Sequence, residues 1–131
     1  MSNTEVVKTF YEMTDRGNMD AVMALMSPDI LWTEMAGFPY GGTYRGKEAV
    51  MSGVFARLGS DWDDFSVTRD AFYDAGDTVV ISGNYSGVYK KTGKGFNARF
   101  THIWKLKDGK IIKMEQFVDT LLVDRAVNPQ N

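Results

Sequence analysis

The sequence predicts an α+β fold in which a curved, mostly antiparallel sheet packs against helices near the N-terminus. Apolar residues recur at helical spacing in three segments before residue 60, whereas the alternation typical of strands dominates from residue 65 to residue 118. One strand-like segment, residues 30–35, interrupts the helical half. The predicted order is therefore two helices, a strand, a third helix, a run of strands and a short final helix.

Each predicted helix combines an apolar stripe with a signal that begins or ends it. The first stripe covers residues 6–14, and Gly17 ends that helix. Asn18 is a suitable cap for the second helix, which Pro28 prevents from continuing. Residues 47–58 restore the helical spacing after a glycine-rich loop, so a third helix is expected there.

The later strands form a predicted antiparallel meander. One run covers residues 65–72, three more lie within residues 78–118, and Asp119 is placed to cap the final helix. Short clusters of Gly, Asp and Lys separate the runs and predict tight turns at residues 74–77, 90–94 and 108–109.

Length, composition and charge limit the classes of protein to consider. The 131 residues fit one domain, residues 1–131, and the absence of cysteine excludes disulfides and thiolate metal sites. A net charge of -2 does not suit phosphate neutralisation, so no nucleic-acid partner is expected. The start lacks a signal-peptide pattern and no apolar run is long enough to span a membrane, which predicts a cytoplasmic protein.

Two local patterns are similar to known ligand-binding loops but lack residues that such loops require. Asp61, Asp63 and Asp64 lack the glycine and distal glutamate of a calcium loop, so a solvated turn is predicted. A glycine pattern ending at Lys47 is similar to a phosphate loop, but Glu48 stands where a serine or threonine would bind magnesium. We therefore predict no metal and no cofactor.

Four stretches carry a resemblance to a known family: residues 19–26, the strand ending at Glu34, residues 44–50 and residues 102–119. Together they resemble the nuclear transport factor two-like superfamily, and within it SnoaL-like polyketide cyclases and ketosteroid isomerases. The resemblance implies a cystatin-like cone, in which the curved sheet wraps the helices and leaves a cavity. It also implies a small, largely apolar organic ligand and a homodimer formed through the outer face of the sheet.

The isomerase resemblance implies a catalytic role for Glu34, which occupies the position of the proton-shuttling base. The two acids that would stabilise the developing oxyanion correspond to Phe10 and Thr101, so this charge would be poorly stabilised unless a shifted register brings in the adjacent Tyr11. A purely structural ion pair between Glu34 and Arg45 is the alternative reading of this carboxylate.

The cyclase resemblance implies two further candidates, His102 and Gln116. Glutamine stands where a cyclase has its catalytic aspartate; it can orient a carbonyl but cannot exchange a proton usefully. His102 alternates with Phe100 and Trp104, which equally suits a hydrogen-bonded core histidine. The isomerase resemblance instead directs Thr101, of opposite parity, into the cavity.

Two functions therefore remain open. In the first, an isomerase- or cyclase-type enzyme uses Glu34 to move a proton next to a carbonyl, with His102 and Gln116 assisting. In the second, a non-catalytic ligand-binding or dimerisation domain has lost its catalytic acids. The residues predicted to line the cavity are Trp32, Phe38, Met51, Phe55, Tyr85 and Trp104.

Overall fold

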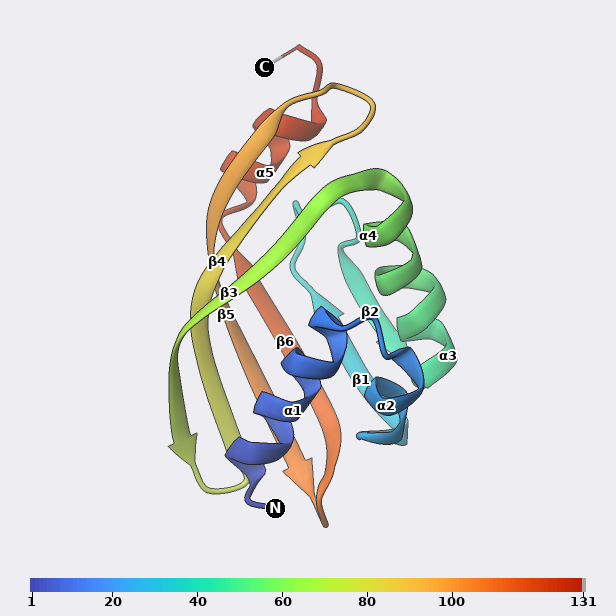
Figure 1. Cartoon of the computed structure of the whole chain (residues 1–131), viewed down its shortest axis with the longest axis vertical. Helices are drawn as coiled ribbons and strands as arrows, with labels where there is room; N and C mark the ends of the chain where they lie inside the picture. Colours follow the sequence, from blue (N-terminus) through green and yellow to red (C-terminus); the bar gives the residue numbers. More distant parts are fainter. Residues whose placement is uncertain (131) are drawn as a thin grey trace.

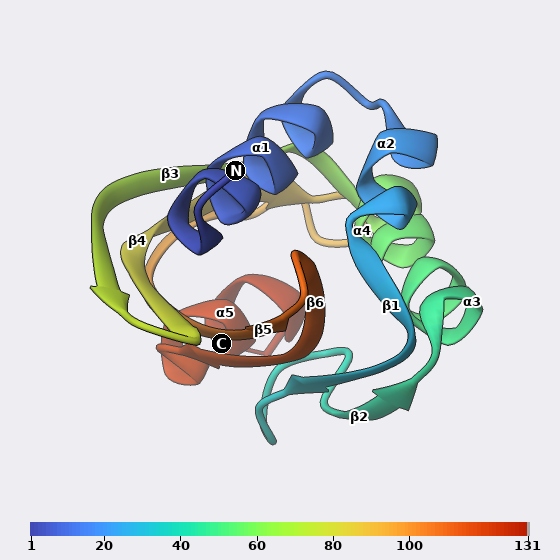
Figure 2. The same cartoon turned by 90° about the horizontal axis from the view of Figure 1, so that it is seen from below.

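One strongly curved, unclosed sheet wraps around the N-terminal helices, as Figures 1 and 2 show. The structure is a computed structural model and describes residues 1–130. The strand order is β2-β1-β6-β5-β4-β3, and all neighbours are antiparallel except β1 and β6, which run parallel. The predicted α+β fold is therefore confirmed. The strands are β1 (Met26–Glu34), β2 (Gly42–Arg45), β3 (Trp62–Ala75), β4 (Thr78–Tyr89), β5 (Gly95–Lys107) and β6 (Lys110–Val118).

Three of the helices begin where a capping side chain satisfies a free backbone N–H group. Ser2 and Glu5 form a capping box at the start of α1 (Asn3–Asp15). Asn18 caps α2 (Met19–Ala24) and Asp119 caps α5 (Thr120–Val127), which confirms both predicted caps. In Figure 1, α1 crosses in front of the sheet, whereas α5 lies near the far end of β4 and β5.

The predicted third helix is continuous but contains a π-helical turn. It consists of α3 (Lys47–Val50), the π-helix η1 (Met51–Phe55) and α4 (Ala56–Asp61). Gly53 within η1 packs directly against the ring of Tyr44, since an added Cβ would lie 2.4 Å from Tyr44 Cε1. The π turn accommodates one extra residue, and such turns occur often near functional sites.

Two sequence predictions need correction. Strand β1 begins four residues earlier than predicted and includes Pro28, which is tolerated because the pairing with β6 shifts register between Met26 and Leu31. The expected solvated turn around Asp63 and Asp64 is instead the start of β3. These two residues form a β-bulge, because the β3–β4 register shifts there and Asp64 adopts a φ of 53°.

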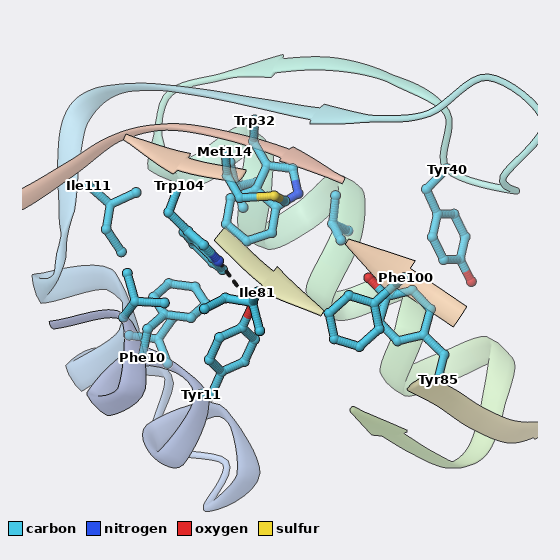
Figure 3. Packing of buried hydrophobic residues seen from close by; sticks show 14 of the residues in the cluster. Phe10, Tyr11, Trp32, Tyr40, Ile81, Tyr85, Phe100, Trp104, Ile111 and Met114 are labelled. Carbon is cyan, nitrogen blue, oxygen red and sulfur yellow. Dashed lines mark hydrogen bonds between the residues drawn. The ribbon is translucent and has the colours of Figure 1, made fainter. Parts of the chain in front are cut away.

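An aromatic cluster fills the space between α1 and the concave face of the sheet. Figure 3 shows Phe10 and Tyr11 from α1 facing Trp32 from β1 and Trp104 from β5. The Phe10 ring centroid lies 4.8 Å from that of Trp104 and 5.9 Å from that of Trp32. These large apolar surfaces supply much of the burial that holds the helix on the sheet. No helix within residues 1–130 has the length and apolar character needed to cross a membrane.

Candidate functional site

The three predicted catalytic residues lie in one row across the sheet. The β1–β6 register pairs Glu34 with Gln116, and the β5–β6 register pairs Gln116 with His102. Side chains at paired positions of neighbouring strands stand close together on the same face. All three are buried and line a cavity on the concave side. Thr101 has the opposite parity and does not line this cavity, so its predicted place there is wrong.

The cavity lies between α1, the π turn and the sheet, and has a volume of about 60 Å³. Its walls are mostly apolar and aromatic. Of the six residues predicted to line it, Met51 does not, because the π turn directs Val54 and Phe55 inward instead. The other five line the cavity together with Phe10 and Tyr11: Trp32, Phe38, Phe55, Tyr85 and Trp104.

Glu34 is a buried acid without an ionic partner. Only 4% of its surface is exposed, and none of the ion pairs formed within residues 1–130 involves it. The alternative ion pair between Glu34 and Arg45 does not form, and Arg45 lies opposite Leu31 in the β1–β2 register, at a position of opposite parity to Glu34. Burial raises the pKa of the Glu34 carboxyl from 4.5 to about 8. The nearby Trp32 indole lowers this pKa by a smaller amount but makes no hydrogen bond of good geometry.

His102, in contrast, has a hydrogen-bond partner on each ring nitrogen. The Tyr11 hydroxyl lies 2.6 Å from Nδ1, and the Tyr85 hydroxyl contacts Nε2. The Trp104 indole N–H donates to the Tyr11 oxygen at 2.9 Å, the contact dashed in Figure 3. Burial lowers the pKa of the His102 imidazole to about 3, so the ring is neutral at physiological pH.

Gln116 is only half satisfied. Its Oε1 accepts a hydrogen bond from the Met35 backbone N–H at 3.2 Å. Its buried Nε2 group lowers the pKa of the nearby Tyr85 hydroxyl but forms no hydrogen bond of good geometry. The Trp32 indole N–H is the other buried side-chain donor without a partner in the part of the chain that the structure describes. Because nearly all buried polar groups in proteins are hydrogen-bonded, two such donors at one cavity indicate a place for ligand acceptors.

A wider hollow of about 700 Å³ adjoins the cavity and forms its mouth. Phe55, Leu58 and Phe65 belong to both walls. At the rim, the Arg69 guanidinium pairs with Asp15 at 2.9 Å and lies over the ring of Tyr11, 5.0 Å from its centroid. The loop before β2 is anchored rather than loose, since Phe38 and Tyr40 within it are buried.

Tyr11 is the polar site residue that sequence reasoning did not select. The signal was available, because a tyrosine in the apolar stripe of a helix must find a partner for its hydroxyl when it is buried. No group of three His, Cys, Asp or Glu side chains within residues 1–130 is arranged to hold a metal ion.

The curved sheet, the helices on its concave face and the polar row inside an apolar cavity define the class of cone-shaped α+β domains that bind small molecules. The chain belongs to the SnoaL-like domain family, whose model matches residues 7–114. This also places it among the NTF2-like proteins. A search of curated proteins finds no match.

Solved structures support the same assignment. An NTF2-like protein from Burkholderia thailandensis is 47% identical, with a TM-score of 0.95 over 98% of this chain and 99% of that chain. An NTF2-like protein of unknown function from Burkholderia pseudomallei is 25% identical, with a TM-score of 0.89 over 98% and 99% of the two chains. A protein with a ketosteroid isomerase-like fold from Catenulispora acidiphila is 24% identical, with a TM-score of 0.75 over 89% and 86%; it shares the fold.

Proposed function

We propose that this protein binds a small, largely apolar carbonyl compound and that Glu34 transfers a proton at the carbon next to the carbonyl. The observation that carries the proposal is a carboxyl group buried in an aromatic cavity without an ionic partner. A protein that needed Glu34 only for stability would gain more from an apolar residue or a paired charge at this position.

The raised pKa suits this chemistry. A general base works best when its pKa lies near the operating pH, and that of Glu34 is about 8. The ionised carboxylate takes the proton as the C–H bond breaks, and the electron pair moves to give an enolate. The protonated carboxyl then returns the proton to the same or another carbon, as isomerases and cyclases require.

The shape of the site limits the ligand. The inner cavity of about 60 Å³ accepts only the reacting end of an organic molecule, whereas the mouth hollow of about 700 Å³ accepts the remainder. Most residues shared by the two walls are apolar, with Thr14 and Asp15 as the exceptions, so the body of the ligand is expected to be apolar or aromatic.

Deuterium uptake tests the elementary step without knowledge of the full reaction. A panel of cyclic and aromatic ketones is incubated with the protein in D₂O, and exchange of the hydrogens next to the carbonyl is followed by NMR. At least one ketone should exchange faster with the wild type, and Glu34→Gln should reduce the enzymatic rate about 10²–10⁴-fold. Exchange that Glu34→Gln leaves unchanged would contradict the proposal.

A second candidate function is ligand binding without catalysis. Phe10 and Gln116 favour it, because both line the cavity at positions where the resemblance implies catalytic acids. This function predicts that ketones raise the melting temperature while no exchange occurs in D₂O. The homodimer stays a prediction, which analytical ultracentrifugation would test.

A further inference from the structure

The hydrogen-bonded chain at the end of the polar row contains one more proton than it has bonds. Its members supply four protons, one from the Trp104 indole, one from each of two tyrosine hydroxyls and one from the neutral His102 ring. Three hydrogen bonds link them: Trp104 to Tyr11, Tyr11 with His102, and Tyr85 with His102. One tyrosine hydroxyl proton is therefore left to point away from the chain.

The tautomer of His102 decides which tyrosine has the free proton. An indole can only donate, so the Tyr11 oxygen always accepts from Trp104. With the proton on Nδ1, Tyr11 would accept twice, and its own proton would need another acceptor. No further hydrogen bond of the Tyr11 hydroxyl is formed within residues 1–130.

With the proton on Nε2, each member of the chain donates to the next, from Trp104 to Tyr85. Tyr11 donates to Nδ1, Nε2–H donates to the Tyr85 oxygen, and the Tyr85 proton is left over. Tyr85 lines the same cavity as Glu34 and Gln116. The Glu34 charge raises the pKa of the Tyr85 hydroxyl, and the nearby Gln116 amide lowers it without forming a hydrogen bond of good geometry. This tautomer turns the free proton toward the end of the cavity that holds Glu34 and Gln116, whereas the other tautomer leaves the Tyr11 proton without an acceptor beside Trp104.

We propose that His102 is held as the neutral Nε2–H tautomer, so that the Tyr85 hydroxyl and the Gln116 amide together donate to one oxygen of the ligand. The inference rests on the proposed function and names its ligand more closely. A pair of donors suits a carbonyl oxygen that gains negative charge as Glu34 removes the neighbouring proton. His102 is then a positioning residue, whereas Tyr85 and Gln116 touch the substrate.

The packing around Tyr85 holds this donor in place. Phe100 stacks on the Tyr85 ring at a centroid distance of 4.4 Å and lies 4.2 Å from the His102 ring. Gly83 makes room for Phe100, because an added Cβ would lie 2.6 Å from its Cζ atom and 2.0 Å from the Thr68 carbonyl oxygen. A donor fixed before the ligand arrives needs no reorganisation when charge develops.

Histidine ¹⁵N NMR tests the tautomer directly, because the sequence contains a single histidine. At pH 7 we expect one protonated nitrogen, assigned to Nε2, and one unprotonated nitrogen, assigned to Nδ1. A proton on Nδ1, or on both nitrogens, would overturn the proposal. This measurement needs neither a ligand nor activity.

Binding of phenols tests the donor pair. Phenols of increasing acidity imitate the charged oxygen, and methylbenzenes of the same shape lack it. Wild-type protein at pH 7 should prefer the most acidic phenol over its methylbenzene about ten- to hundredfold by calorimetry. Tyr85→Phe and Gln116→Leu should each lose most of that preference. The control Tyr73→Phe, at an exposed position outside the cavity, should retain it.

The outcomes separate this inference from the proposed function. Equal binding of phenols and methylbenzenes, together with Glu34-dependent deuterium exchange, would overturn the donor pair alone. A phenol preference that depends on Tyr85, without any deuterium exchange, would uphold the donor pair and contradict proton transfer by Glu34.

Discussion

Glu34 and His102 stand in the same row of the sheet and are almost equally buried, with 4% and 6% of their surfaces exposed. Burial acts on both in the same way, since it favours the neutral form, so the pKa of the acid rises and that of the base falls. Their partners differ. His102 has a hydroxyl at each nitrogen, whereas the Glu34 carboxyl forms no hydrogen bond of good geometry with the nearby Trp32 indole or Tyr85 hydroxyl. We infer that the satisfied group organises the cavity and that the unsatisfied group serves the ligand.

Apart from removal of the acid, the largest effect is expected from moving it. Glu34→Asp retains a carboxyl group but withdraws it by one methylene from the reacting carbon. Misplacement by about 1 Å can cost on the order of 10²-fold in rate, so ketone deuteration should fall by roughly that factor. Exchange at the wild-type rate would show that the position of the carboxyl does not matter.

The same acid should make stability depend on pH in an unusual direction. Glu34 ionises near pH 4.5 in the unfolded chain but near pH 8 in the fold, so the folded state binds more protons between these values. The free energy of unfolding should therefore fall as pH rises from 5 to 8, by a few kcal/mol at about 1.4 kcal/mol per pKa unit. Urea denaturation measures this loss, and Glu34→Gln should remove it. A wild-type curve that matches that of Glu34→Gln would contradict the raised pKa.

His102 should limit stability on the acid side. Its pKa is about 3 in the fold and 6.5 in the unfolded chain, so its contribution is complete above pH 6.5 and is lost as pH falls toward 3. His102→Phe should remove this dependence. It should also cost about 1–3 kcal/mol at pH 7, because the Tyr11 and Tyr85 hydroxyls lose a partner. No loss at pH 7 would show that these hydrogen bonds do not organise the cavity.

The smallest effects are expected from alanine substitutions at two glycines. Gly83→Ala should destabilise the protein by about 1–3 kcal/mol and loosen Tyr85, because the new methyl group collides with Phe100 and with backbone. Gly59 lies in α4 with nothing within 4 Å of an added Cβ, so Gly59→Ala should stabilise by up to about 1 kcal/mol. Thermal unfolding of both variants provides the check. Equal effects would show that Phe100 is not tightly packed there.

Much of the fold could be predicted because its signals are local. The stripe of α1, the caps at Asn18 and Asp119 and the turn at residues 108–109 each depend on a few neighbouring residues. The alternation in β5 also placed His102 among apolar neighbours. The start of β1 was predicted too late because proline is excluded only from regular strand pairing, whereas the pairing of β1 is irregular at Pro28.

The individual site residues could be predicted from the sequence, but their arrangement could not. Glu34, Gln116 and His102 come from three strands, and the row they form depends on the parallel pairing of β1 with β6, which no local pattern specifies. The choice between Thr101 and His102 likewise needed the knowledge of which face the helices cover. The hydrogen bond between Tyr11 and His102 joins residues 91 positions apart.

A carboxyl titration of Glu34 by ¹³C NMR tests the central claim most directly. The signal is assigned by its absence from Glu34→Gln, and its chemical shift is followed from pH 3 to pH 10. We predict a midpoint near 8, which identifies an unpaired acid kept neutral by burial and ready to exchange a proton. A midpoint near 4.5 would mean that water or a counter-ion reaches the carboxylate, and the proposed role of Glu34 would be wrong.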